Sequence, residues 1–170
     1  MLAEDAPAIA AAVRVSMEHL RPWMSWATTE AGDPRGQLAR VAEADELWEA
    51  GTDFIYSIML APGGTLIGEI GLHHRVGDAG IEIGYWIDAR QVGRGHGSEA
   101  ARMLTAVALS LPAVSRVEIQ CDTANEASAA IPRKLGYRLD RIDPHEPEAP
   151  GEVGHRMIWV LQRPGELCAG

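Results

Sequence analysis

The chain has 170 residues, of which 46% are hydrophobic, and its formal net charge at pH 7 is −9. This length fits one domain that is large enough to bury a core without disulfides. Its two cysteines, Cys121 and Cys168, lie far apart and form no Cys-x-x-Cys or Cys/His cluster. This argues against a disulfide scaffold or a zinc site and fits a reducing, cytoplasmic location. The negative charge disfavours nucleic acid as a partner, and no apolar run approaches the length that spans a membrane.

The N-terminal part of the sequence shows two helical patterns separated by a tryptophan-bearing loop. A first helix is predicted from Asp5 and Pro7 onward, and its apolar residues at helical spacing are Ile9, Val13, Met17 and Leu20. The loop RPWMSWATTEAGD follows. A second helix is predicted from Asp33–Pro34 to about Gly51, and one of its faces carries Leu38, Val41, Ala44 and Trp48.

Beyond the second helix the hydrophobic pattern changes to the alternation that is typical of strands. Residues 53–60 and 65–75 are predicted to form a hairpin across the turn APGG, and residues 81–87 a third strand. A helix then follows a glycine-rich loop and ends at Pro112. The remaining predicted elements are a strand at 116–122, a short helix at 125–136, and strands at 137–142 and 155–163. The pattern predicts an α+β domain with antiparallel strands first and a strand–loop–helix–strand unit in the middle.

The glycine-rich loop, QVGRGHGSEAARML at residues 91–104, alternates glycine with Arg and His before a helix begins. Such a loop typically holds a phosphate, because a helix N-terminus is electropositive and its first amides lack partners. A P-loop needs Gly-Lys-Ser/Thr, whereas Gly97 is followed by Ser98. A dinucleotide fingerprint needs a third glycine where Ser98 stands, and it would lie near the start of the fold. A glycine turn with a purely structural role stays open as the alternative.

Several short motifs follow one another in a fixed order. EIGYW, the glycine loop VGRGHG, a Glu-Ala helix start, N-x-x-S and KLGY lie between residues 82 and 137, with RPWMSW upstream. Together they resemble the GNAT acyltransferase superfamily, in particular its RimJ/RimL-like branch, which acetylates protein N-termini; the resemblance is strongest over residues 65–141. It implies a GNAT-like α+β fold with a mixed, mostly antiparallel sheet, formed by a single domain over residues 1–170. It also implies an N-acetyltransferase that uses acetyl-CoA as cosubstrate, needs no metal and acylates a primary amine by direct attack in a ternary complex.

The resemblance assigns a coenzyme A site to the glycine loop and to the strand before it. Backbone amides would bind the pyrophosphate, and Arg94 would add a charge-assisted contact. The pantetheine arm would lie along the end of the strand at 81–87, where a backbone N–H is the expected donor to the thioester oxygen. Asn125 of N-x-x-S would bind pantetheine and cap the short helix, or only cap it. The implied cofactor-binding residues are Tyr85, Trp86, Ile87, Gly93, Arg94, Gly95, Gly97, Ser98 and Asn125.

Two residues are implied to carry the chemistry. Glu82 corresponds to the strand-borne glutamate of the family, and a half-buried carboxylate among apolar neighbours is suited to take a proton from the amine. A glutamate engaged in a salt bridge is an equal alternative, and Glu69 on the neighbouring strand is the fallback base. Ser128 of N-x-x-S would donate a proton to the coenzyme sulfur.

Three features depart from the family pattern. Val92 stands where the loop usually begins with Gln or Arg. Pro132 occupies the place of an acid tyrosine, and its ring is expected to interrupt the short helix by clashing with the Ser128 carbonyl. No strand is predicted before the first helix, so residues 54–60 would form an uncovered sheet edge, which an upstream segment or a homodimer would hide.

The acceptor mouth is expected to lie between the tryptophan loop and the loop at residues 143–154. Acids on both walls would favour a protonated amine or a basic N-terminal segment, although a solvated loop explains them equally well. These acids are Glu30, Asp33, Asp143, Glu146, Glu148 and Glu152. Acetylation of a small amine or antibiotic, and a domain that binds acyl-CoA without turnover, stay open as alternatives.

Other chemistry-bearing side chains receive structural interpretations. His73 and His74 lack a third ligand at metal spacing, so solvent-facing or core positions are predicted for them. Core packing is likewise favoured over a place in the acceptor mouth for Trp23, Trp26 and Trp48. Cys121 alternates inward on its strand and is predicted to be in the core.

Overall fold

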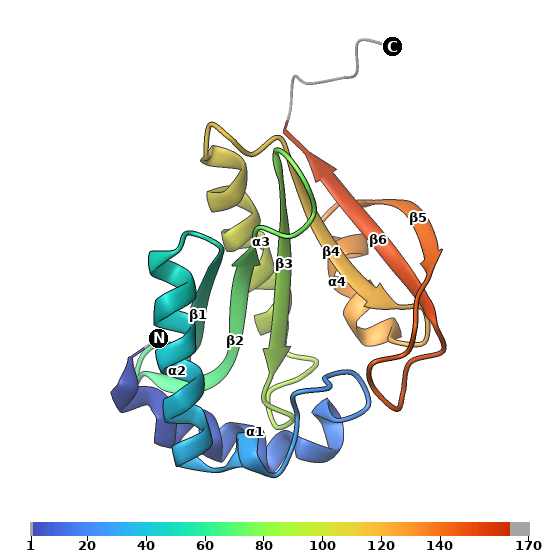
Figure 1. Ribbon diagram of the computed structural model, residues 1–170. Coiled ribbons are helices and arrows are strands. Elements are labelled where there is room, and N and C mark those ends of the chain that lie inside the picture. Colours follow the sequence, from blue (N-terminus) through green and yellow to red (C-terminus); the bar gives the residue numbers. More distant parts are fainter. Residues whose placement is uncertain (1, 164–170) are drawn as a thin grey trace, which may run out of the picture.

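In the part of the chain that the structure describes, six strands form one sheet that carries helices on both of its faces (Figure 1). The computed structural model describes residues 2–163. The strands are β1 (Asp53–Leu60), β2 (Thr65–His73), β3 (Gly80–Ile87), β4 (Arg116–Asp122), β5 (Arg138–Pro144) and β6 (His155–Gln162). The helices are α1 (Ala6–Leu20), α2 (Pro34–Glu49), α3 (His96–Ser110) and α4 (Glu126–Lys134), with short 3-10 helices η1 (Ala3–Asp5) and η2 (Glu30–Gly32). The predicted order of elements is confirmed.

The strand order in the sheet is β1-β2-β3-β4-β6-β5. In the described part of the chain only β3 and β4 pair in parallel, and α3 makes the crossover that a parallel pair requires. The other neighbouring strands are antiparallel. The fold is therefore α+β with a mixed, mostly antiparallel sheet, as predicted.

Alternation along the strands sends apolar side chains to both faces of the sheet, so the molecule has two cores. α1 and α2 cover one face, here called the front face, and α3 and α4 cover the rear face (Figure 1). The front core includes Ile9, Val13, Leu20, Val41, Leu66 and Trp86. The rear core includes Ile70, Leu72, Ile81, Ile83, Ala101, Leu104, Val117, Ile119 and Trp159.

The buried face of α2 differs from the prediction. Val41 and Ala44 are buried as expected, but Leu38 and Trp48 are 47% and 40% exposed. Gln37 is fully buried instead, because its side-chain amide donates to a carbonyl oxygen of η2 at 2.5 Å. A polar residue whose amide is hydrogen-bonded can occupy a buried position, which the hydrophobic pattern alone does not reveal.

β1 lies at one edge of the sheet. Within residues 2–163 it pairs with β2 alone, and no strand precedes α1. Trp48, at the end of α2, packs against Phe54 and Tyr56 with ring centroids 5.0 and 5.3 Å apart. Trp48 therefore packs on the β1 edge, where it is partly exposed. The prediction that it is a core residue was wrong.

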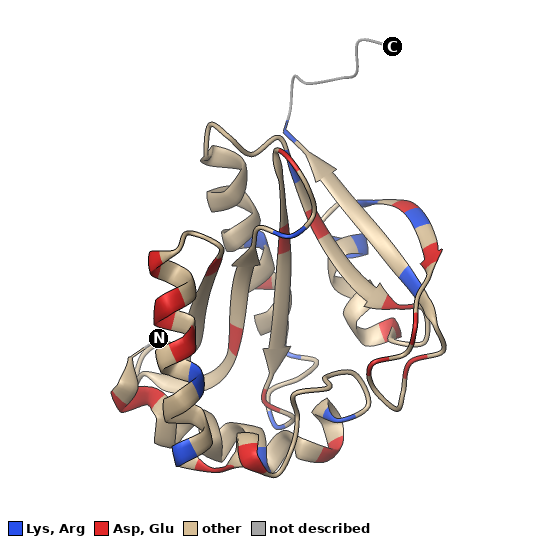
Figure 2. Ribbon diagram, in the orientation of Figure 1, with Lys and Arg blue, Asp and Glu red and all other residues tan. Residues whose placement is uncertain are grey.

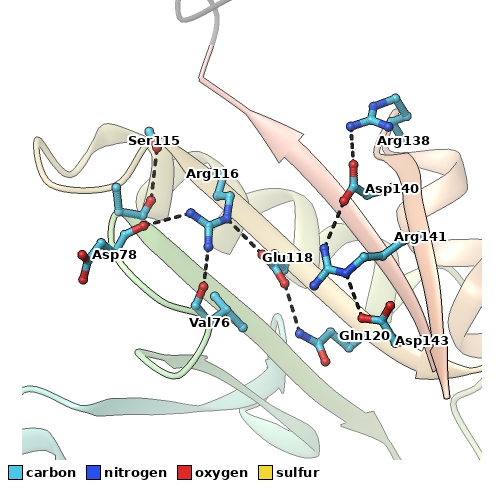
Figure 3. A network of polar contacts seen from close by, with 11 residues as sticks. Val76, Asp78, Ser115, Arg116, Glu118, Gln120, Arg138, Asp140, Arg141 and Asp143 are labelled. Carbon is cyan, nitrogen blue, oxygen red and sulfur yellow. Dashed lines mark hydrogen bonds and ion pairs between the residues drawn. The ribbon is translucent and has the colours of Figure 1, made fainter. Parts of the chain in front are cut away.

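β5 forms the other edge and is strongly charged (Figure 3). Arg138 donates to Asp140 at 2.5 Å, and Arg141 donates to Asp140 at 3.0 Å and to Asp143 at 2.8 Å. Charged side chains on an edge strand resist pairing with another chain. The two edges thus differ, since β1 carries aromatic and aliphatic side chains.

A polar network holds β3 and β4 together at one end (Figure 3). The guanidinium of Arg116 donates to Glu118 Oε1 at 3.0 Å, to the carbonyl oxygen of Asp78 at 2.9 Å and to that of Val76. It ties the loop before β3 to the first residues of β4. Gly80 leaves room for this guanidinium, because a Cβ there would lie 2.7 Å from Arg116 Cζ.

Candidate active site

Beyond that fixed end, β3 and β4 diverge and a pocket opens between them. Their pairing runs from Gly80↔Arg116 to Glu82↔Glu118 and stops there, so in the described part of the chain no strand pairs with residues 83–87 on the β4 side (Figure 1). The pocket at this divergence has a volume of about 620 Å³. An unpaired strand end presents backbone donors and acceptors to which an extended ligand can bind like a missing strand.

A pair of glycines forms the floor of this pocket on the front face of the sheet. Gly71 of β2 and Gly84 of β3 are direct cross-strand neighbours, and both line the pocket. Because neither carries a side chain, the front face is hollow between two rows of larger residues. These rows are the cross-strand pairs Glu69↔Trp86 and His73↔Glu82.

The glycine loop leaves a run of backbone amides free at the start of α3. Gly95 is the N-cap residue with a φ of 86°, and Gly93 has a φ of 73°, a conformation that favours glycine. Within residues 2–163 no hydrogen-bond acceptor engages the N–H groups from Gly93 to Ser98. Such a group of amides at a helix N-terminus is suited to bind an anion.

Gly97 connects this loop to the strand splay. A Cβ at Gly97 would lie 3.1 Å from Ile131 Cδ1 and 3.4 Å from Ile87 Cγ1. The absence of a side chain therefore lets the first turn of α3 approach both β3 and α4. Arg94, three residues earlier in the loop, is exposed. The start of α3 therefore lies next to the end of β3. Of the predicted coenzyme residues, Tyr85, Trp86 and Asn125 line the pocket, whereas Ile87 and the loop residues Gly93, Arg94, Gly95, Gly97 and Ser98 do not.

Tyr85 reaches from the rear side of β3 to α4. Its hydroxyl donates to the carbonyl oxygen of Ser128 at 3.1 Å and lies 3.2 Å from Ser128 Oγ. Burial raises the pKa of Tyr85 far above its ordinary value, against the opposing hydrogen bond with Ser128. The phenol therefore keeps its proton at neutral pH. A second hydroxyl lies next to the predicted acid, and the sequence motifs did not reveal it.

Pro132 does not interrupt α4, so that prediction was wrong. The helix runs through Pro132 without a break. Proline has no N–H to offer the carbonyl four residues earlier, which is that of Ser128, and the Tyr85 hydroxyl supplies a donor in its place. Asn125 caps the helix by accepting a hydrogen bond from the Ser128 N–H at 3.1 Å, and it also lines the pocket.

Glu82 lies in a bidentate ion pair. Arg75 donates from Nε to Oε2 at 2.9 Å and from Nη2 to Oε1 at 2.7 Å. The surroundings of Glu82 are thus not purely apolar, and the structure shows the salt bridge that the sequence left as the alternative. The hydrogen bond with Glu82 raises the pKa of Arg75, so the guanidinium stays charged.

Glu69 is the more deeply buried carboxylate of the pocket, with only 2% of its surface exposed. Its Oε2 accepts from Arg40 Nη2 at 2.7 Å and from Trp86 Nε1 at 2.9 Å. Its Oε1 is buried without a hydrogen-bond partner among the described residues. Burying such an oxygen without a donor is costly, so this atom marks a point where a ligand donor would bind.

The mouth of the pocket carries both signs of charge. Glu148 and Glu152 of the β5–β6 loop line it, as do Trp23 and Trp26 of the tryptophan loop. Lys and Arg are interspersed with the acids around this end of the molecule (Figure 2), and Arg156 lies 3.5 Å from Glu148. The other predicted acids do not line the pocket; they are Glu30, Asp33, Asp143 and Glu146. The mouth is therefore mixed in charge and not uniformly acidic.

Asp122 holds the β5–β6 loop against the end of β4. Its Oδ2 accepts from the N–H groups of Val153 at 3.0 Å and Gly154 at 3.1 Å, and lies 3.2 Å from His145 Nε2. Burial acts to raise the pKa of Asp122, but backbone N–H donors and His145 outweigh it and lower the pKa. Asp122 thus positions one wall of the pocket.

His73 lies in the pocket and contacts Asp53 through its Nδ1. It was predicted to be a solvent-facing or core residue, and the structure places it beside the glycine floor. Asp53 is 20 residues away in the sequence, so only the pairing of β1 with β2 brings the two together. No local motif could have revealed this pair.

Cys121 is buried in the rear core as predicted, and it also lines the pocket. Burial raises the pKa of its thiol to about 11, against an opposing hydrogen bond with Ser128. Cys168 lies outside the described residues. Among the described residues no group of three or more potential metal ligands occurs. None of the helices described is long and apolar enough to cross a bilayer.

A splayed parallel strand pair, followed by a loop of free amides that opens a helix, defines an acyltransferase of the GNAT class. In agreement, residues 1–138 match the family model described as acetyltransferase (GNAT) domain. The chain therefore belongs to the GNAT acetyltransferase family, and it is an N-acetyltransferase. The comparison with curated proteins found no match.

Solved structures share this fold over almost the whole chain. Ribosomal-protein-S5-alanine acetyltransferase from Vibrio fischeri is 18% identical, with 99% of this chain and 93% of that chain covered and a TM-score of 0.85. RimL, a ribosomal L7/L12 alpha-N-protein acetyltransferase solved with coenzyme A, is 18% identical, with 95% and 90% covered and a TM-score of 0.85. The microcin C7 self-immunity acetyltransferase MccE, solved with acetyl-CoA and AMP, is 15% identical, with 95% and 88% covered and a TM-score of 0.85. At these identities the likeness shows a common fold.

Proposed function

We propose that this enzyme transfers the acetyl group of acetyl-CoA to the primary amine of a protein N-terminus, by direct attack in a ternary complex. One observation carries the proposal: the strand splay joins the carboxylate-lined hollow on the front face to the hydroxyls of Ser128 and Tyr85 on the rear face. Two reactants that approach from separate surfaces could meet at this opening, and holding them in place removes much of the entropic barrier.

The coenzyme site would extend from the glycine loop into the splay. The free amides at the start of α3 would bind the pyrophosphate, with Arg94 beside them. The unpaired backbone of β3 would bind the pantetheine arm, and Asn125 would face it from the start of α4. The residues proposed for this site are Tyr85, Trp86, Ile87, Gly93, Arg94, Gly95, Gly97, Ser98 and Asn125.

Glu82 and Ser128 are the proposed catalytic residues, on opposite sides of the splay. The leaving thiolate would take a proton from Ser128, whose hydroxyl lies 3.2 Å from that of Tyr85. Glu82 would act on the acceptor side, where it lines the pocket next to the glycine floor while paired with Arg75. Neither role requires a metal.

A primary amine fits the front face of the pocket. The unpartnered Oε1 of Glu69 offers an acceptor for an ammonium group, and Glu82 lies on the other side of the glycine floor. Two of the similar structures are enzymes named for acetylating ribosomal proteins, which supports a protein N-terminus as acceptor. MccE is an immunity acetyltransferase, so a small amine or antibiotic is the second candidate.

A thiol-release assay with acetyl-CoA tests the proposal against N-terminal peptides and small amines in one panel. We expect the highest kcat/KM with a peptide N-terminus and none with the same peptide blocked at its α-amine. Turnover with small amines alone would favour the second candidate. A coenzyme-induced rise in Tm without thiol release from any acceptor would indicate a binding domain without turnover.

We also propose a cytoplasmic homodimer without nucleic-acid or membrane partners. The net charge of −9 supports the absence of a nucleic-acid partner, and the free, buried thiol of Cys121 supports a reducing, cytoplasmic location. The β1 edge, with Tyr56 and Met59 36% and 44% exposed, supports association of two copies. Sedimentation of the full chain should give a dimer and Met59→Lys a monomer; a monomeric wild type would contradict the dimer.

A further inference from the structure

Three side chains form a row across the front face of the sheet. Asp53 of β1 is the direct cross-strand neighbour of His73 of β2, and His73 is the direct neighbour of Glu82 of β3. All three alternate to the same face as the glycine floor. The imidazole thus lies between two carboxylates at the edge of the hollow.

Asp53 determines which nitrogen of the imidazole faces the hollow. Its Oδ1 contacts His73 Nδ1, and an ionised carboxylate only accepts hydrogen bonds, so Nδ1 carries the proton. The neutral ring then has an unprotonated Nε2. A carboxylate that orients a histidine in this way also stabilises the imidazolium once a proton arrives.

His73 Nε2 lies directly over the glycine floor. A Cβ at Gly71 would lie 2.7 Å from this nitrogen, and a Cβ at Gly84 would lie 3.3 Å from it. Any side chain at Gly71 would therefore displace the ring. The His73 side chain is 14% exposed and lines the pocket, so the ring is largely shielded from solvent at the place where an acceptor would bind.

We propose that His73 is the general base that takes the proton from the acceptor amine, with Asp53 as its positioning residue. This rests on the proposed function. Nε2 would take one proton from the ammonium group, and the freed nitrogen lone pair would form the N–C bond to the thioester carbonyl carbon as the C–S bond breaks. The second amine proton goes to the sulfur through Ser128 and the coenzyme leaves as a thiol. His73 then releases its proton to water.

Glu82 is less suited to this step because both of its oxygens already accept hydrogen bonds from Arg75. Glu69 has one oxygen without a hydrogen-bond partner among the described residues. This oxygen could bind the ammonium group of the acceptor or take a proton from it, so it does not single out Glu69 as the base. Asp53 on β1 contacts His73 directly. The charged residues that line the same pocket are Arg40 on α2, Glu69 on β2, Arg75 after β2, Glu82 on β3, Asp122 at the end of β4, Glu148 and Glu152 in the β5–β6 loop, and Arg156 on β6. Proton uptake by His73 therefore occurs beside two carboxylates, with Arg75 nearby.

The test compares the pH dependence of kcat/KM in His73→Gln and His74→Gln. The same acceptor is used throughout, so that titration of the acceptor amine contributes equally to every pH profile. His74 is a matched control, because it packs edge-on against Phe54 outside the pocket. We expect His73→Gln to lower kcat/KM about 10²-fold or more, the usual contribution of a general base, and to flatten the acidic limb of the pH profile. His74→Gln should retain both.

Two further variants separate a base from a merely structural residue. His73→Ala should regain activity when imidazole is added, because the small base can occupy the space of the ring. Asp53→Asn should lower kcat more than it raises KM, since an amide can hold the ring in the other tautomer. Each variant should keep the coenzyme-induced rise in Tm of the wild type, which shows that it is folded.

The outcomes distinguish this proposal from the proposed function. An active wild type together with a His73→Gln variant that retains kcat/KM and an unchanged acidic limb overturns the role of His73 alone. A second combination of results also overturns it. In this case imidazole does not restore the activity lost in His73→Ala, and the acidic limb of the pH profile is unchanged in His73→Gln. A wild type that binds the coenzyme but acetylates no amine overturns the proposed function, and this proposal with it.

Discussion

The hydroxyl of Tyr85 donates across 3.1 Å to the carbonyl oxygen of Ser128, the one carbonyl of α4 that Pro132 leaves without a helical donor. The same hydroxyl lies 3.2 Å from Ser128 Oγ. Pro132 thus stands where the family pattern has a tyrosine that acts as an acid, and Tyr85 brings a phenol hydroxyl from β3 to Ser128 instead. The contact both completes the helix and gives Ser128 a neighbour that can replace its proton.

Tyr85→Phe should therefore lower kcat about 10-fold or more while leaving coenzyme affinity nearly unchanged, since general acids contribute on the order of 10²-fold. Ser128→Ala should show the same pattern with a larger effect. Because burial raises the pKa of Tyr85 above its ordinary value, its loss of a proton should not produce an alkaline limb below pH 10. Steady-state kinetics and calorimetric binding of coenzyme A measure the two quantities. Equal kcat in wild type and both variants would contradict the acid pair.

Glu82→Gln should lower kcat/KM about 10-fold, because it removes a negative charge from the pocket and leaves the charge of Arg75 without its counter-ion beside the reacting amine. If His73 is the base, the acidic limb of the pH profile remains in this variant. Asp140→Asn is the control, since it removes a carboxylate from an ion-paired strand far from the pocket. An acidic limb that disappears in Glu82→Gln and persists in His73→Gln would return the role of base to Glu82.

Gly95→Asn tests the pyrophosphate site. Asparagine tolerates the φ of 86° at this position, and its side chain would occupy the open space next to the amides that should bind phosphate. Coenzyme A at 100 times its Kd should stabilise the wild type by about 2.7 kcal/mol, and this gain should be lost in the variant. Gly51→Asn is the control, because Gly51 also has a positive φ and open space around its Cα but lies remote from the loop. An unchanged gain in Gly95→Asn would argue against the site.

Cys121 should react slowly with iodoacetamide at pH 7, because burial raises the pKa of its thiol to about 11 and only the thiolate is the nucleophile. The rate should rise about 10-fold per pH unit up to that value, as the thiolate fraction does. A Cys168→Ser background leaves Cys121 as the only thiol. Bound coenzyme A should protect it, since Cys121 lines the pocket; a rate that ignores coenzyme A would place the arm elsewhere.

Asp122→Asn should destabilise the domain by about 1–3 kcal/mol at pH 7, because several N–H groups of the β5–β6 loop lose their carboxylate acceptor. The pKa of Asp122 is lowered in the folded state, so its contribution is present above the ordinary value of about 3.9 and is lost as pH falls through the folded-state value. Urea unfolding at pH 7 and pH 3 measures the difference between wild type and variant. The difference should shrink at pH 3; a constant difference would show that the charge of Asp122 does not matter.

The sequence by itself determined the elements and the family. Alternation of apolar residues predicted β4 at its observed bounds, and Asp33 before Pro34 predicted the start of α2, because both signals act between residues close in the chain. The glycine loop was predicted to bind a phosphate for the same reason, because the first amides of a helix lack partners within it. The order of motifs from EIGYW to KLGY then indicated the GNAT fold.

Only the tertiary structure decided what each side chain of the site contacts. Glu82 meets Arg75 and Tyr85 meets Ser128, partners 7 and 43 residues apart, and Asp53 meets His73 through strand register. Gln37 replaces Leu38 in a buried face because a carbonyl of η2 happens to be within reach of its amide. Partners of this kind are set by how strands pair and helices pack, and local spacing carries no information about them.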